Sequence, residues 1–460
     1  MAEKKIQSGN LLTSGSISQK ITLFFLPILL GSFLQQLYNT ADAIIVGKFV
    51  GTAALSAVGG TTNVILNLLI GFFIGLSSGA TVIISQYFGA EDSDSVNRSV
   101  HTAIALCLVG GAVLTVVGLL TAPALLHSLN TPEDVLQYAI PYLRIYFIGT
   151  IGNLFYNMGS GILRAVGDSK GPLLVLICST VVNVLLDLLF VGALHLATTG
   201  AAIATILCQL FSATLVLTMV HRKGEAFRIS PKKLRLEKNL LRKICMIGLP
   251  AGLQSVMYSL SNLIIQGAVN SFGTDNIAAW TVYGKIDSIF WMIMDAFGTA
   301  ITTFIGQNYG AGKLGRVKKG IRVCFVMCFG IAILLSALLY FFGSYLTVLF
   351  TDDPFVLNRA TELLHFMVPF FFTWCCIQVL ASTLRGVGDT LIPMLLIAFG
   401  VCGIRVLWVL VIAPLLPSAL ENTVCCYQIS WSITSVFFLL YYFKKSPLRR
   451  LVKEIRPCEE

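Results

Sequence analysis

Apolar runs long enough to cross a lipid bilayer, roughly twenty residues or more, recur along the whole 460-residue chain. Hydrophobic residues make up 56% of the chain and charged residues only 12%, too little polar material to cover a soluble globule of this size. The runs are continuous and lack the period-two alternation of a membrane β-strand. The sequence therefore predicts an all-α integral membrane protein.

These runs define twelve expected transmembrane helices, with a polar segment at either end of the chain. Residues 1–20 and the basic tail at 444–460 are both expected in the cytoplasm. The first run lacks a small-residue cleavage site and is too long for a secretory signal, so we expect it to be retained as a helix. The approximate bounds of the twelve helices are 21–47, 54–84, 99–126, 135–160, 171–193, 198–220, 241–270, 277–305, 320–350, 360–383, 391–415 and 422–443.

The positions of the basic residues indicate the orientation. With both termini in the cytoplasm, 27 of the 32 Lys and Arg residues fall on the cytoplasmic side. Lys48 and Arg359 fall outside, and Arg144, Lys285 and Arg405 lie within spans. Topology thus explains the net charge of +10, and no nucleic-acid partner is expected. We expect a multi-pass protein of the bacterial cytoplasmic membrane.

Two short phrases occur once in each half of the chain. LRAVGDSKGP at 163–172 matches LRGVGDTLIP at 384–393, and QYFGAED at 86–92 matches QNYGAGK at 307–313, each 221 residues later. The first phrase follows the fourth helix of its half, where a glycine allows a sharp cytoplasmic bend. We interpret it as a duplicated turn that fixes helix docking, with Arg164 expected to pair with Asp168 and Arg385 with Asp389.

The repeats indicate a duplicated six-helix unit. We expect an N-terminal lobe at 21–220, a basic cytoplasmic linker at 221–240 and a C-terminal lobe at 241–443. Six crossings bring both copies into the membrane with the same orientation. The expected architecture is therefore two pseudo-symmetric bundles around a central cavity.

Two carboxylates of the first half have no counterpart in the second. Asp42 in the first span aligns with Ile265, and Asp187 in the fifth aligns with Trp408. An ionised carboxylate near the bilayer centre costs roughly 2.5–3.5 kcal/mol on insertion scales, so both residues imply compensation and a use. A small hard cation or a proton would neutralise them.

Polar side chains at helical spacing accompany these carboxylates on the first, fourth and fifth spans. The three stripes are Gln35, Tyr38, Asn39 and Asp42; Asn153, Tyr156, Asn157 and Ser160; and Thr180, Asn183 and Asp187. From these stripes we expect substrate-cavity contacts from Gln35, Asn39, Asn153, Tyr156 and Asn157. Interhelical hydrogen bonding is the open alternative for the Asn and Tyr positions.

The second half carries a different polar set. Tyr258 and Asn262 share a face of the seventh span, and Asp287 and Trp291 share a face of the eighth. We expect these four residues to line the substrate cavity, although Lys285 and Asp287 could instead neutralise each other. Arg405 in the eleventh span has no partner that the sequence indicates.

The motifs together resemble the multidrug and toxic compound extrusion (MATE) family. Pro27, YNTADAIIVGKFVG around Asp42, QYFGA, LRAVGD and NVLLD carry the resemblance over essentially all twelve spans. It implies two six-helix lobes with a V-shaped cavity and exchange of organic compounds for H⁺ or Na⁺. The implied cation-linked residues, which could also hold Na⁺, are Asp42, Asn183 and Asp187, with Tyr38 and Tyr142 beside them. The spans 241–270 and 366–384 lack the acidic ligands of the NorM-like branch.

The sequence thus favours a secondary antiporter that exports amphipathic, often cationic organic molecules by alternating access. We expect a functional monomer that needs no cofactor besides the coupling ion and has small organic substrates and the lipid bilayer as partners. A flippase for lipid-linked or polyisoprenoid intermediates is the alternative. An enzyme is not expected, because the chain lacks HExxH, GxSxG and any Cys/His metal spacing.

Overall fold

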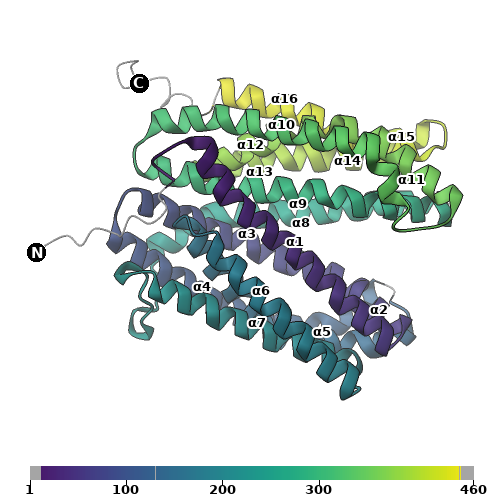
Figure 1. The fold of residues 1–460 in the computed structure, drawn as a ribbon, viewed down its shortest axis with the longest axis horizontal. Coiled ribbons are helices and arrows are strands. Elements are labelled where there is room, and N and C mark those ends of the chain that lie inside the picture. The colour runs from purple at the N-terminus through teal and green to yellow at the C-terminus, as the bar shows by residue number, and fades with distance from the viewer. Residues whose placement is uncertain (1–11, 130, 445, 447–460) are drawn as a thin grey trace, which may run out of the picture. The chain divides into compact units, whose positions relative to one another are not determined.

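The computed structural model describes residues 12–129, 131–444 and 446, so most of the expected N-terminal segment and C-terminal tail lies outside the described residues. Every regular element in the described part is helical, as the sequence predicts (Figure 1). In chain order the elements are α1 Ile17–Phe49, α2 Thr52–Gly59, α3 Thr61–Gly89, α4 Ser93–Ser128, α5 Glu133–Ala165, α6 Lys170–Asp187, η1 Leu188–Ala193, α7 Ala197–Arg222, η2 Glu225–Phe227, η3 Pro231–Lys233, α8 Lys238–Asn270, α9 Thr274–Gly310, α10 Leu314–Thr347, α11 Pro354–Met367, η4 Val368–Phe370, α12 Phe371–Val387, α13 Leu391–Ile397, η5 Ala398–Gly403, α14 Ile404–Leu407, η6 Trp408–Ile412, η7 Ala413–Leu415, α15 Leu420–Val424 and α16 Cys426–Lys444.

The helices coincide with the apolar runs. Eleven helical segments of the described chain are long and apolar enough to cross a membrane. The remaining expected span, 135–160, lies within α5, a helix of 33 residues. The second expected span is broken at Gly60, which separates α2 from α3. Most helices run past the ends of their apolar runs, because a helix can continue into the interface with polar residues.

The chain divides into two compact units whose boundaries fall inside helices. Among the described residues, unit 1 comprises 23–252 and unit 2 comprises 12–22 and 253–446. The start of α1 thus belongs to unit 2, and the start of α8 belongs to unit 1. The lobe and linker bounds expected from the repeat remain a sequence prediction.

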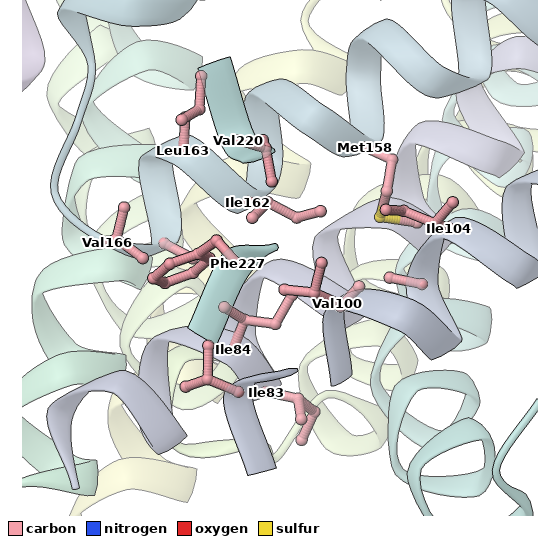
Figure 2. Packing of buried hydrophobic residues seen from close by; sticks show 14 of the residues in the cluster. Ile83, Ile84, Val100, Ile104, Met158, Ile162, Leu163, Val166, Val220 and Phe227 are labelled. Atoms are coloured by element: carbon pink, nitrogen blue, oxygen red, sulfur yellow. The ribbon is translucent and has the colours of Figure 1, made fainter. Parts of the chain in front are cut away.

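A hydrophobic core in unit 1 anchors the basic linker (Figure 2). Phe227 of η2 is 3% exposed and packs among side chains of α3, α4 and α5, with its ring centroid 6.3 Å from that of Phe88. Hydrogen bonds from Asn97 Nδ2 to the Ala226 carbonyl (2.9 Å) and from the Ser230 amide to His101 Nε2 (3.1 Å) hold the linker on α4. The linker is therefore an ordered part of unit 1.

The repeated QxxGA phrase contacts a basic or backbone partner in each unit. In unit 1, Lys243 Nζ donates to the Tyr87 hydroxyl at 2.8 Å. In unit 2, the Leu12 amide donates to Gln307 Oε1 at 3.0 Å, and Asn308 Nδ2 donates to the Leu12 carbonyl at 3.3 Å. Lys243 lies in the first turns of α8, the first helix of the second half, and Leu12 lies just before α1, the first helix of the first half.

The repeated LRxVGD phrase forms the same turn twice. Gly167 and Gly388 adopt φ values of +84° and +95°, which favour glycine. In each copy the glycine amide bonds the carbonyl three residues back and the aspartate amide bonds the carbonyl five residues back, as in a Schellman motif. The duplicated-turn interpretation therefore agrees with this geometry.

The expected pairing of the arginines with these aspartates is wrong. Asp168 accepts from the Gly171 amide at 2.8 Å and pairs with Lys223, while Asp389 accepts from the Tyr441 hydroxyl at 2.7 Å. Within the described chain, Arg164 Nε is buried without a hydrogen-bond partner. After the glycine turn, Asp168 contacts the start of α6 and Asp389 contacts α16. The nearness of each arginine and aspartate in the sequence gives no indication of these contacts.

Helices α3 and α8 approach closely through glycines inside unit 1. A Cβ added at Gly75 would lie 2.3 Å from the Gly252 nitrogen, and one added at Gly79 would lie 2.4 Å from the Ile244 carbonyl oxygen and 2.7 Å from the Gly248 nitrogen. Such small-residue crossings let two backbones pack directly in a membrane.

Replacing Gly79 with alanine is expected to lower the free energy of unfolding by about 1–3 kcal/mol, because backbone atoms would have to move. Thermal unfolding of the purified protein in detergent measures the effect. Gly330→Ala is the matched control, since a Cβ at that helical glycine meets nothing within 4 Å. It should leave stability unchanged or raise it by up to about 1 kcal/mol. Equal shifts for both variants would contradict the close approach.

Candidate functional site

The polar residues singled out in the first half meet within unit 1. Asp42 lies on α1, Tyr142 on α5, and Asn183 and Asp187 on α6. Their exposed fractions are 7%, 4%, 0% and 0%. Asn183 and Asp187 are one turn apart, so they share a face of α6. The structure thus buries both carboxylates among membrane-spanning helices.

These groups lie near one another without forming direct bonds. Asp42 and Asp187 are within electrostatic range of each other, and Tyr142 is within range of both. Several polar atoms of the described residues are buried here without a hydrogen-bond partner. They are Asp42 Oδ1, both carboxylate oxygens of Asp187, and the amide oxygen and nitrogen of the Asn183 side chain. Buried polar atoms are ordinarily paired, so this concentration indicates that something else satisfies them.

Local backbone geometry sets Asp187 apart. It is the last residue of α6, and the helix continues as the π-helical segment η1. A π-helical turn inserts an extra residue and redirects the following side chains, and such turns are frequent at functional sites. The sequence contains no proline or glycine at 182–190 that would signal it.

Two further residues join this site: Tyr146, which the sequence offers as an alternative to Tyr142, and Gln209, which sequence reasoning missed. Tyr146 on α5 is 8% exposed, with its ring centroid 6.1 Å from that of Tyr142. Gln209 on α7 donates to the Tyr146 hydroxyl at 3.0 Å, and its Oε1 is buried without a partner. A lone glutamine in the apolar run 198–220 was the available signal. Tyr38 lies on α1, half-buried, and within electrostatic range of Asp42 and Tyr146.

The other predicted cavity residues show simpler surroundings. Asn157 Nδ2 donates to Asn153 Oδ1 at 2.8 Å along α5, and both are half-buried, like Tyr156. On α1, Gln35 is half-buried and Asn39 is exposed. The geometry does not test their contact with substrate, so the cavity assignment stays a prediction.

The site suits a small cation or a proton. Asp42, Asp187 and Asn183 offer four unpartnered oxygen atoms, the donor type that hard cations prefer. No group of three or more His, Cys, Asp or Glu residues arranged to hold a metal occurs among the described residues. A transiently bound Na⁺ or H⁺ fits such a donor set better than a resident transition metal.

Unit 2 contains its own cluster of polar side chains, which lies beside aromatic rings. Trp291 Nε1 donates to Asp287 Oδ2 at 2.8 Å, and Arg405 Nη1 donates to Asn262 Oδ1 at 3.5 Å. Tyr258 and Trp374 have ring centroids 6.2 Å apart. The four predicted residues of this half therefore lie with Arg405 in unit 2, whereas Lys285 is exposed.

The MatE family model matches residues 27–189 and again residues 250–411. The chain belongs to the MATE family. The two matches confirm the duplication inferred from the repeated phrases, and several relatives of this chain are multidrug resistance or multidrug export proteins. In this MATE transporter each match contains one copy of the LRxVGD turn.

Relatives and solved structures agree with the assignment. A probable multidrug resistance protein, YoeA of Bacillus subtilis (strain 168), is 28% identical over 450 residues, 95% of this chain and 96% of its own. An FAD transporter of Shewanella oneidensis is 26% identical over 354 residues, 75% of this chain and 77% of its own. The crystal structure of MATE in the bent conformation matches with a TM-score of 0.89 at 22% identity, covering 98% of this chain and all of that one.

Cation binding at Asp42 and Asp187 should stabilise this MATE transporter, because a ligand that binds only the folded state adds about 2.7 kcal/mol at one hundred times its Kd. If the coupling ion is Na⁺, we expect the melting temperature in detergent to rise when Na⁺ replaces choline. If it is H⁺, we expect the melting temperature to rise when the pH is lowered. Asp42→Asn and Asp187→Asn should each abolish the rise. Asp134→Asn, at an exposed carboxylate of α5, should keep it. An unchanged rise in both site variants would exclude this site.

Proposed function

We propose that the protein is a secondary active antiporter that exports amphipathic organic compounds, many of them cationic, in exchange for H⁺ or Na⁺. The observation that carries the proposal is the pair of buried carboxylates, Asp42 and Asp187, which have oxygen atoms without hydrogen-bond partners, together with buried Asn183 one turn before Asp187. Family membership supplies the class of activity, and this cluster supplies the means of coupling.

The energetics favour such a role. Two carboxylates within electrostatic range repel each other in a medium of low dielectric constant, so a bound cation lowers the free energy of the conformation that holds it. An ion entering down a membrane potential contributes about 2.3 kcal/mol per charge per 100 mV. A ligand shifts a two-state equilibrium only by its differential affinity for the two states, and occupied and empty carboxylates provide that difference.

The coupling residues lie on helices that can carry a rearrangement. Asp42 lies on α1, which contains Pro27 inside the helix, and Asp187 adjoins the π-helical η1. Proline and π-helical turns are the ordinary places where a helix bends. Neutralising Asp42 and Asp187 would therefore change the packing of two helices that have a built-in irregularity.

The names of relatives leave the substrate range wide. They include multidrug resistance proteins and an FAD transporter. We propose export of small organic molecules with a planar aromatic part, because the indole rings of Trp291, Trp374 and Trp431 lie close together in unit 2 and could pack against such a group.

Efflux from proteoliposomes tests the coupling. A fluorescent organic cation should leave the vesicles when either a proton gradient or a sodium gradient is imposed, and Asp42→Asn and Asp187→Asn should each reduce the gradient-driven rate at least about tenfold, equivalent to about 1.4 kcal/mol. Asp134→Asn should transport like the unmodified protein.

Two outcomes would redirect the proposal. Normal gradient-driven transport by both site variants would show that the carboxylates do not couple. Folded protein that moves no soluble dye under either gradient, but moves a fluorescent polyisoprenoid or lipid between leaflets, would favour the flippase alternative.

A further inference from the structure

Arg405 is a buried cation near the middle of a membrane-spanning segment, Leu391–Leu415. Only 2% of its side chain is exposed. A charged side chain at this depth is expensive unless a partner compensates it, and residues of this kind mark substrate or ion pathways. The cation-coupling role proposed for the first half does not use it.

The guanidinium is incompletely satisfied. Nε donates to Ser430 Oγ at 3.2 Å, Nη1 donates to Asn262 Oδ1 at 3.5 Å, and Nη2 is buried without a partner. No carboxylate of the described residues lies within 4.0 Å of it, although Asp287 is within electrostatic range. The bond to Asn262 is at the long limit for a hydrogen bond. Three of the five N–H groups, one on Nη1 and two on Nη2, thus remain available to a planar acceptor.

Aromatic rings surround this cation. Its central carbon lies 4.1 Å from the Tyr427 ring centroid and 5.8 Å from that of Trp431. Trp431 is in turn edge-on to Trp291 and Trp374, with centroids 5.9 Å and 6.1 Å away. The Trp431 indole nitrogen is buried without a partner in the described chain. We call Tyr258, Trp291, Trp374, Tyr427 and Trp431 the aromatic cluster.

The backbone around Arg405 is irregular in the same way as that around Asp187. The short helix α14 that carries it lies between two π-helical segments, η5 and η6. The repeat aligns Arg405 with Val184 and Trp408 with Asp187. The corresponding helices therefore carry charges of opposite sign, an anion in the first half and a cation in the second.

The edge of the cluster is accessible. Asn262 is exposed, and Tyr258, Asp287 and Trp291 are half-buried, whereas Arg405 and Trp431 are buried. A molecule that reaches Asn262 would displace only its 3.5 Å bond to reach Nη1. A carboxylate there could bind Nη1 and Nη2 together, the bidentate arrangement that arginine favours.

We propose that the aromatic cluster and Arg405 form a binding site for planar aromatic carboxylates, with the guanidinium on the carboxylate and the rings against the flat part. This inference names a substrate class for the exporter proposed above, and it rests on that function.

Equilibrium binding to the purified full-length protein in detergent tests the site without any ion gradient. The probes are 2-naphthoate, its neutral methyl ester and 2-naphthylmethylammonium, measured by calorimetry. Three of the five tryptophans lie in the cluster, so a change in tryptophan emission should accompany binding. We expect 2-naphthoate to bind at least about tenfold more tightly than the other two, as one charge-assisted bidentate contact provides. Equal affinities for the three probes would overturn the proposal.

Two variants locate the contact. Arg405→Gln should weaken 2-naphthoate binding at least about tenfold and leave the ester unchanged. Asn262→Asp, at an exposed position, should keep the fold and weaken the carboxylate similarly, because the new side chain would pair with Arg405 itself. Lys318→Gln removes an exposed charge of unit 2 and should change neither affinity. Unchanged 2-naphthoate affinity in Asn262→Asp would overturn the assignment even where Arg405→Gln fails to fold.

The outcome is separable from that of the coupling experiment. Carboxylate-selective binding together with failed gradient-driven efflux would remove the proposed antiport and keep the site. Coupled efflux of organic cations without any carboxylate preference would remove the site and keep the antiport.

Discussion

The hydrocarbon interior offers no hydrogen-bond partner, and every level of this structure reflects that constraint. The backbone of the spans is folded into helices, and many hydroxyl side chains within the spans donate to carbonyls of their own helix, as Thr150 donates to Tyr146 and Thr205 donates to Ala201. The buried side-chain atoms of the described residues that lack a hydrogen-bond partner include atoms of the ionisable residues Asp42, Asp187 and Arg405. An ionisable side chain without a partner is unfavourable in the hydrocarbon interior, and the roles proposed above would give each of these three residues a partner.

The duplication separates what folding requires from what binding requires. Both halves keep the glycine turn of LRxVGD, with the same φ sign and the same two backbone bonds. Both halves also have a π-helical segment at nearly equivalent positions: η1 begins directly after Asp187, and η6 begins at Trp408, which the repeat aligns with Asp187. The side chains at these positions differ completely. The backbone irregularity was therefore retained through divergence, while the charge it presents changed.

The sequence could predict the helices, the repeat and the first-half cluster, because each depends on local composition or spacing. Asp42, Asn183 and Asp187 stand on predicted helix faces, and those faces do meet. The sequence could not predict contacts between residues that are far apart in the chain. Gln209 bonding Tyr146 depends on how α7 packs on α5, and Lys223 pairing with Asp168 depends on the docked linker. The break at Gly60 coincides with a Gly–Gly pair that could have indicated it, whereas the π-helical turn after Asp187 has no proline or glycine at 182–190 to mark it.

The unit boundaries inside α1 and α8 have a consequence for biosynthesis. Unit 1 includes the first turns of α8 up to residue 252, so its packing cannot be completed when the sixth span leaves the ribosome. Unit 2 includes residues 12–22, which are made first and must wait for the last helices. Each unit therefore needs a segment from the other half of the chain before its packing is complete. Neither gene half, translated alone, would encode a complete hydrophobic core.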